Sequence, residues 1–490
     1  MSSAEFRCTP NTGSLIALVL GILALSGCAT VQRDARFPEV QTAVAQRLGH
    51  NVEWTGETKG DERAQQSIRS LLQRELSAET AVQIALLGNR RLQAKFENLG
   101  LAQADLVDAG LFDNPVLSAG ALFQNAGTEL DVDIVQNFLG VFALAARKKI
   151  GQARTQRVTL EVSGEVLDLA AQVQSQYYRV VGDAEALALA RQVVVSAQAA
   201  AEIAERQYAA GNLSKREQGL HQLFYAQNIL ELAQAETQLD ADREKLTRLM
   251  GLWGADTGWK IPDRLPEVPA NLPVLEQLEK RAISERMDLA AAKKEVEALT
   301  HAVKLARQYR WLSAFGIGVQ FQRDASGEKS YGPRIELGLP LFNQGQVQIQ
   351  RMESERQRAE NQVAALAVDI RSEAREMRAR VLASAQVVKH YQSALLPLQQ
   401  SIVDETLKFY NGMLIGVYDL LLASQSQVHT ARQYITANRD FWHAWTELER
   451  TVGGRIALTE AQAAPTPPLA PPAGTPVPAG NAHQHGEQQS

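Results

Sequence analysis

Residues 311–345, WLSAFGIGVQFQRDASGEKSYGPRIELGLPLFNQG, contain two stretches in which apolar residues alternate with small or polar ones. The apolar face of the first stretch consists of Phe315, Ile317, Val319 and Phe321, and that of the second of Ile335, Leu337, Leu339 and Leu341. A polar turn that contains glycine separates the two stretches. Alternation on both sides of such a turn predicts a β-hairpin. Each predicted strand has about ten residues, which is the length a tilted strand needs to cross a bilayer.

A second hairpin of the same kind is predicted earlier in the chain. An apolar run covers residues 116–123, and the following stretch alternates Leu130, Val132 and Ile134 with Glu129, Asp131 and Asp133. A long helical segment follows each hairpin. This repeated order predicts two copies of one unit, over residues 77–254 and 276–453, joined by a connector over 255–275.

The long helical segments share an unusual spacing of apolar residues. Positions such as Val162, Val166 and Val173 in the first copy, and Ile370 and Ala374 in the second, follow a spacing of four, four and three. That spacing gives about 3.67 residues per turn and favours nearly straight helix packing. A helix of about 60 residues would be about 90 Å long.

Both long helices are predicted to reverse direction at a glycine, Gly211 in the first copy and Gly412 in the second. A glycine at this position permits the left-handed cap of a tight reversal. The predicted tips consist of Gly211, Asn212, Leu213, Gly412, Met413 and Leu414. A second helix returns from each tip, so each copy is a β-hairpin attached to a long helical hairpin.

The start of the chain resembles an exported bacterial protein. Residues 1–27 have the features of a secretory signal, and Leu25-Ser26-Gly27-Cys28 resembles the lipoprotein box. Cleavage before Cys28 would leave this cysteine as the acylated first residue, anchored by its hydrocarbon chains. A signal without lipidation and a short buried helix are the alternatives. Residues 28–76 are polar, and we expect an extended segment lying against the body.

The end of the chain differs in composition from the body. Residues 454–490 are rich in Pro and Ala, which predicts a disordered tail. This tail carries His483 and His485, which form at most a weak metal site. The other histidines of the body are isolated in the sequence, so we expect no resident metal.

The composition excludes several classes of function. The 490 residues include 45% hydrophobic and 21% charged residues, with a net charge of −5 and no basic cluster suited to nucleic acid. The two cysteines both lie within the first 28 residues, so the body has no disulfide framework. No motif for phosphate binding, zinc hydrolysis or nucleophilic catalysis occurs. We therefore expect neither an enzyme nor a cofactor.

Taken in order, these features resemble the TolC-like outer membrane efflux factor family. The resemblance covers about residues 77–453 and rests on four features: the lipoprotein box, the duplicated order, the two reversals and the exit Pro340-Leu341-Phe342-Asn343-Gln344-Gly345. It implies a mainly α fold with a membrane β-barrel. Three chains would form a 12-stranded barrel that a periplasmic α-helical tunnel continues. It also implies the outer membrane of a Gram-negative bacterium, a periplasmic adaptor and an inner-membrane pump of the resistance-nodulation-division type.

The resemblance suggests roles for several groups of residues. The tips would contact the adaptor, although packing against the neighbouring hairpin of the trimer is an equal alternative. Tyr418 and Asp419 would close the periplasmic gate. The charged strand residues Asp131, Asp133, Arg334 and Glu336 would face a water-filled lumen, where charge is tolerated. The apolar strand residues, including Ile317, Val319, Leu337 and Leu339, would face outer membrane lipid.

Two functions are compatible with this sequence. The first is a passive outer membrane export duct of a tripartite efflux pump for small substrates, with a lean towards metal ions from the histidines of the tail. The alternative is a lipid-anchored periplasmic structural coiled-coil protein without a pore. The β-hairpins favour the duct, since a helical rod has no use for strands of membrane-spanning length.

Overall fold

The computed structural model describes residues 31–55, 58–125, 127–273, 275–311 and 314–457. Cys28 with its signal segment, and His483 and His485 with most of the predicted tail, lie outside the described residues. The chain divides into two compact units. The first contains residues 99–155 and 297–353, and the second contains 37–98, 156–296 and the chain from 354 onward.

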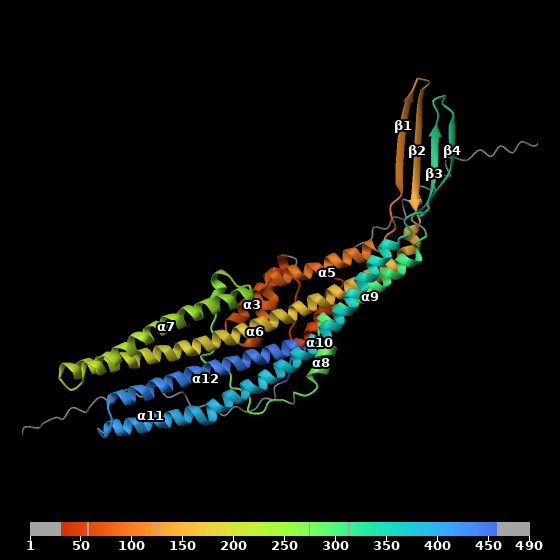
Figure 1. Ribbon diagram of the computed structural model, residues 1–490. Helices are drawn as coiled ribbons and strands as arrows, with labels where there is room; N and C mark the ends of the chain where they lie inside the picture. Colours follow the sequence, from red (N-terminus) through yellow and green to blue (C-terminus); the bar gives the residue numbers. More distant parts are fainter. Residues whose placement is uncertain (1–30, 56–57, 126, 274, 312–313, 458–490) are drawn as a thin grey trace, which may run out of the picture. The chain divides into compact units, whose positions relative to one another are not determined.

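The first unit contains one antiparallel sheet of four strands (Figure 1). The strands are β1 (Val116–Gln124), β2 (Gly127–Asn137), β3 (Ala314–Arg323) and β4 (Lys329–Gly338), and they are adjacent in that order. Both predicted hairpins are confirmed, and the pairing of β2 with β3 joins them. The strands have 9 to 11 residues, as the sequence predicted.

The predicted end of the last strand was wrong. β4 ends at Gly338, so Leu339 and Leu341 lie beyond it although their spacing continues its alternation. Pro340 cannot donate a backbone hydrogen bond to a ladder. Instead, the Leu341 N–H donates to the Leu339 carbonyl at 2.9 Å in a tight turn.

A glycine allows β2 and β3 to approach closely. A Cβ added at Gly318 would overlap the carbonyl oxygen of Ile134 and would lie 2.9 Å from the Cα of Val135. Gly332 in β4 is different, since nothing lies within 4 Å of its added Cβ. Gly318 therefore has a structural role in the sheet, which is a common reason for a glycine in a strand interior.

The predicted order of hairpin and long helix is also confirmed. α6 (Leu139–Ala209) follows β2, and α10 (Gln346–His390) follows β4. The Asn137 side-chain oxygen accepts the Leu139 N–H at 2.9 Å, and Gly345 takes a left-handed φ of 75° before α10. With 71 residues, α6 corresponds to about 105 Å of helix.

The expected extended segment over residues 28–76 is instead largely helical. It contains α2 (Phe37–Leu48) and α3 (Thr58–Leu72). The side chains of Phe37, Val40, Val44 and Leu48 are buried on one face of α2. Their spacing of three or four residues is typical of an amphipathic helix. This spacing was not recognised in the sequence because most of the surrounding residues are polar.

Each copy begins with two helices. In the first copy α4 (Ala78–Gly88) starts at the cap Ser77, whose side chain accepts the Thr80 N–H at 3.1 Å. α5 (Arg90–Asp108) is separate because Asn89 interrupts the helix and its side-chain oxygen accepts the N–H groups of Arg91 and Leu92. Asparagine is a favoured residue for starting a helix in this way.

The second copy has the same early break. Here α8 (Leu278–Glu285) and α9 (Met287–Gln308) are separated at Arg286. The connector between the copies contains only the short 3₁₀ helix η1 (Gly254–Thr257).

The long helices of the two copies differ in continuity. α6 is uninterrupted, whereas α10 leads into the π-helical turn η2 (Tyr391–Leu395) and then α11 (Leu396–Asn411). Pro397 lies in the first turn of α11, where its missing N–H is tolerated. A π-turn inside a helix is rare. The spacing of the apolar residues in this segment did not indicate one.

The helical core of the second unit follows the predicted apolar spacing. Buried positions of that pattern are Val162, Val166, Val173, Tyr177, Val180 and Leu187 in α6, and Ile370, Ala374, Val381 and Val388 in α10. Ile370 and Ala374 pack with Ala282 of α8 and Leu289 of α9. Among the described residues, no helix is both long enough and apolar enough to cross a membrane.

The first helical reversal has the predicted glycine cap. Gly211 has a φ of 76°, its N–H donates to the Tyr208 carbonyl at 3.0 Å, and the Asn212 N–H donates to the Gln207 carbonyl at 2.9 Å. This pair of bonds ends α6 in the Schellman pattern. The returning helix α7 (Lys215–Met250) then starts with a capping box between Ser214 and Glu217.

The predicted role of Gly412 in the second reversal was wrong. Gly412 has a φ of −76°, and Met413 takes the left-handed conformation with a φ of 57°. The Met413 N–H donates to Tyr410 at 2.9 Å and the Leu414 N–H to Phe409 at 3.0 Å, as around Gly211. Met413 is thus the structural equivalent of Gly211. The returning helix α12 (Val417–Thr451) follows.

We predict that the three tip positions respond differently to substitution. Met413→Gly should raise the free energy of unfolding by about 1 kcal/mol, because glycine has no penalty in the left-handed region. Gly211→Ala should lower it by a similar amount. Gly412→Ala should be neutral or stabilising, since its φ suits alanine and a Cβ there lies 3.4 Å from its nearest neighbour, the Lys408 carbonyl oxygen. Urea unfolding followed by helical circular dichroism measures all three, and a larger loss for Gly412→Ala than for Gly211→Ala would contradict the assignment.

Candidate functional site

The two faces of the four-stranded sheet have opposite character. The register pairs Asp131 with Gln322 and Asp133 with Gln320, and it pairs Gly318 with Arg334 and Gly316 with Glu336. Partners across an antiparallel pair lie on the same face. Asp131, Asp133, Arg334 and Glu336 therefore share one polar face. That this face lines a water-filled lumen stays a prediction.

The polar face carries a row of acidic side chains on β2, each with a partner from β3 or β4. Arg334 Nη1 lies 3.1 Å from Asp133 Oδ1, and it crosses β3 at the position where Gly318 has no side chain. The Gln320 amide donates to both oxygens of Asp131 at 3.0 and 3.2 Å. The Gln322 amide donates to Glu129 Oε1 at 2.7 Å. These contacts hold the acidic side chains in fixed positions on the face.

The opposite face is apolar and exposed in the single chain. Its exposed members include Leu117, Phe123, Ile317, Val319, Ile335 and Leu337. Leu337 is 55% exposed and pairs with Phe315. A contiguous apolar surface of this kind marks a contact with lipid or another protein.

The edges of the sheet are also open. In the described chain, β1 pairs only with β2, and β4 pairs only with β3. Each edge therefore presents a row of backbone N–H and C=O groups without a strand partner. Such an edge needs water, a covering element or another strand.

The two helical tips differ in exposure. Met413 is 93% exposed and Leu414 is 71% exposed at the second tip. At the first tip Gly211 and Asn212 are exposed, whereas Leu213 is half-buried. The second tip therefore presents the larger apolar surface, which the sequence did not distinguish.

The predicted gate residues lie in the first turn of α12. The Arg216 guanidinium of α7 lies 5.8 Å from the centre of the Tyr418 ring. This distance is within the range of a cation–π contact and connects the starts of the two returning helices. Asp419 is exposed beside it. A role of these residues in closing a gate stays a prediction.

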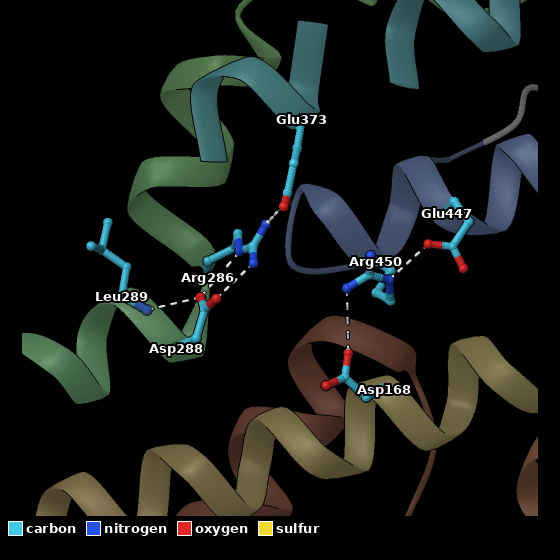
Figure 2. A network of polar contacts seen from close by, with 7 residues as sticks. All are labelled: Asp168, Arg286, Asp288, Leu289, Glu373, Glu447 and Arg450. Carbon is cyan, nitrogen blue, oxygen red and sulfur yellow. Dashed lines mark hydrogen bonds and ion pairs between the residues drawn. The ribbon is translucent and has the colours of Figure 1, made fainter. Parts of the chain in front are cut away.

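Two polar clusters that the sequence did not predict each join helices of the second unit (Figure 2). At the α8–α9 break, Arg286 donates to Asp288 and to Glu373 of α10. Arg450 of α12 donates to Glu447 at 2.8 Å and lies 3.8 Å from Asp168 of α6. Burial raises the pKa of the Asp168 carboxyl. The sequence pattern gave no signal for these contacts, which join residues far apart in the chain.

The described residues contain no candidate metal centre, meaning no group of three or more His, Cys, Asp or Glu side chains that could hold an ion. His443 of α12 shares a hydrogen bond of 2.7 Å with Ser175 of α6.

Comparison with known proteins connects this geometry to outer membrane channels. No protein-family model matches the chain. Over 394 residues, the chain is 23% identical to the cobalt-zinc-cadmium resistance protein CzcC of Cupriavidus metallidurans. The matched region covers 77% of this chain and 90% of the relative.

Solved structures show the same fold. A membrane protein from Pseudomonas aeruginosa matches 77% of this chain and 92% of its own, with a TM-score of 0.66 and 17% identity. The outer membrane protein VceC from Vibrio cholerae matches 80% of this chain and 98% of its own, with a TM-score of 0.65 and 17% identity. The mainly helical fold with paired hairpins is thus confirmed. The chain therefore shares the fold of these solved membrane proteins.

Proposed function

We propose that this protein is the passive outer membrane duct of a tripartite efflux system. The observation that carries the proposal is the four-stranded sheet, which is apolar on one face, charged on the other and open at both edges. Lipid accepts the apolar face, and a water-filled lumen accepts the charged one. A soluble protein would have to cover both the apolar face and the edges.

The open edges support a homotrimer. Backbone groups cannot remain unpaired in the hydrocarbon region of a membrane, so the strands must close into a barrel. Four strands are too few to close one, whereas three chains supply 12, within the range known for outer membrane barrels. In this arrangement β1 of one chain pairs with β4 of the next, and no edge remains.

Energy and selectivity come from partners in this proposal. The duct meets a periplasmic adaptor and, through it, an inner-membrane pump of the resistance-nodulation-division type. The relative named for cobalt, zinc and cadmium resistance favours metal cations as cargo. A passive duct needs no catalytic group and no cofactor.

The alternative is a lipid-anchored structural protein of the periplasm that has no pore. The long helices fit this alternative as well as they fit a duct. The sheet does not, because its exposed apolar face would be left in water.

The strand faces provide the main test. Leu337→Arg places a charge on the proposed lipid face and should cost about 2–4 kcal/mol if the site is near the bilayer midplane. Glu336→Arg is the matched control, since the neighbouring side chain lies on the polar face. Purified wild-type protein should conduct ions across planar bilayers. Its oligomer, detected by the change in electrophoretic migration on heating, should persist in Glu336→Arg and weaken in Leu337→Arg.

In cells, the same two variants test which cargo the proposed duct exports. Leu337→Arg should lower tolerance to cobalt, zinc and cadmium, whereas Glu336→Arg should retain it. A folded oligomer without conductance would favour the structural alternative. Equal effects of both variants would show that the assignment of the faces is wrong.

The helical tips are the proposed contact with the adaptor. Exposed apolar residues such as Met413 and Leu414 suit contact with a partner's helical hairpin. Cysteines at Asn212 and Met413 should crosslink to the adaptor in cells, whereas a cysteine at Gln172, an exposed position within α6, should not. Crosslinks from Asn212 and Met413 only to other copies of this chain would instead support packing between neighbouring hairpins. Tyr418 and Asp419 are the proposed gate beside the second tip.

Outer membrane anchoring is proposed to include acylation of Cys28 after removal of residues 1–27. Small residues before a cysteine that follows an apolar run support this step. Metabolic labelling with a radioactive fatty acid should mark the wild-type protein and leave Cys28→Ser unlabelled. Equal labelling of both proteins would refute the assignment.

A further inference from the structure

Two carboxyl groups meet in the interior of the second unit. Asp183 of α6 and Asp242 of α7 are within hydrogen-bonding reach of each other. Asp242 is fully buried and Asp183 is 9% exposed. Two adjacent buried carboxylates cannot both carry a charge without a large electrostatic cost. The surroundings of the two groups therefore decide which of them is ionised.

Asp242 has the donors that an ionised carboxylate requires. Lys245 Nζ lies 2.8 Å from Oδ1, the Gln176 amide donates to the same oxygen at 3.0 Å, and the Gln238 amide donates to Oδ2. Burial acts in the other direction, but these hydrogen bonds together hold the pKa of Asp242 well below its usual range. Asp242 is the acceptor of the pair.

Asp183 has no comparable set of donors. Its Oδ2 is buried and no donor reaches it in the described structure. Burial and the neighbouring Asp242 raise the pKa of Asp183 to about 7. Its nearest cation is Arg439 of α12, with Nη1 at 3.7 Å, and Arg439 also pairs with Asp440 at 3.1 Å. Arg179 of α6 is the other charged group that acts on it.

The position of Arg439 connects the two copies of the repeat. Its side-chain carbons lie 3.3 Å from where a Cβ of Gly182 would be, so the stem of Arg439 packs on α6 at the residue before Asp183. The guanidinium is thereby held between Asp183 of the first copy and Asp440 of the second. A change in the charge of Asp183 therefore changes whether the Arg439 guanidinium lies closer to Asp183 or to Asp440.

We propose that the proton between Asp183 and Asp242 is a pH-sensitive clasp that fastens α6 to α7 and sets the contact of α6 with α12. With the proton in place, the Asp183 hydroxyl donates to the Asp242 carboxylate, and Arg439 stays with Asp440. When the proton leaves, two anions face each other and Arg439 moves towards Asp183. Acidic surroundings therefore tighten the contact of α6 with α7. Alkaline surroundings loosen that contact and draw Arg439 of α12 towards α6. The clasp does not depend on the proposed duct function.

The direction of the pH effect follows from proton linkage. The folded protein holds the Asp183 proton more tightly than the unfolded chain does, so it binds more protons between about pH 4 and pH 7. The contribution of Asp183 to stability is therefore most favourable near pH 4 and declines as the pH rises through about 7. Asp183→Asn, which keeps a neutral side chain at every pH, should remove this decline.

The experiment uses the full chain purified in detergent. In infrared spectra, the wild type should show a carbonyl band of a protonated carboxylic acid that disappears with a midpoint near pH 7. Burial also raises the pKa of Glu449 to about 7, so this carboxyl contributes to the same band. The band should lose intensity in Asp183→Asn and keep it in Asp240→Asn, the matched control for an exposed aspartate of α7. Arg439→Gln, which removes the nearest cation, should move the midpoint to higher pH.

Unfolding by urea at about pH 5 and about pH 8 provides the second measurement. The wild type and Asp240→Asn should lose stability at the higher pH, and Asp183→Asn should show a smaller loss. A band whose intensity is unchanged in Asp183→Asn, or the absence of any band that titrates near neutral pH, would overturn the proposal.

Discussion

The unpaired edges of the four-stranded sheet limit the surroundings in which the chain can be stable. β1 and β4 each leave a row of backbone donors and acceptors without a strand partner, and one face between them is apolar and exposed. Pairing the edges and burying that face in lipid solve both problems together. In the proposed trimer, closure of the barrel would be a property of the assembly, since four strands are too few to close one.

The features that the sequence predicted well are those with a strict period. Alternation placed Ile317 and Val319 on one face and Asp131 and Asp133 on the other, because successive side chains of a strand point to opposite sides. The apolar spacing of α6 identified Val162, Val166 and Val173 as buried for the same kind of reason. A period is carried by many residues, so an error at one of them does not change the conclusion.

The features that were missed depend on one residue or on contacts between distant ones. The break at Asn89 rests on one side chain that accepts two N–H groups, and the π-turn at Tyr391–Leu395 has no distinctive composition. The contact between Asp183 and Asp242 joins residues far apart in sequence on two consecutive helices, and the ion pair of Arg286 and Glu373 joins residues still farther apart. Sequence order alone does not specify which side chains of two long helices meet.

The second helical reversal shows how the side-chain arrangement of a tip can outweigh backbone preference. Gly412 would accept the left-handed conformation without cost, yet the structure gives it to Met413, where a non-glycine residue costs on the order of 1 kcal/mol. Moving the cap back by one residue would shorten α11 and rotate the segment that holds Leu414 and Ile415. Gly453 and Gly251, which follow the two returning helices, are separated by the same number of residues as Met413 and Gly211. The strained cap therefore preserves the register of the whole returning helix with respect to the first copy. Met413 is almost fully exposed, so among the described residues its side chain makes little contact that could offset this strain.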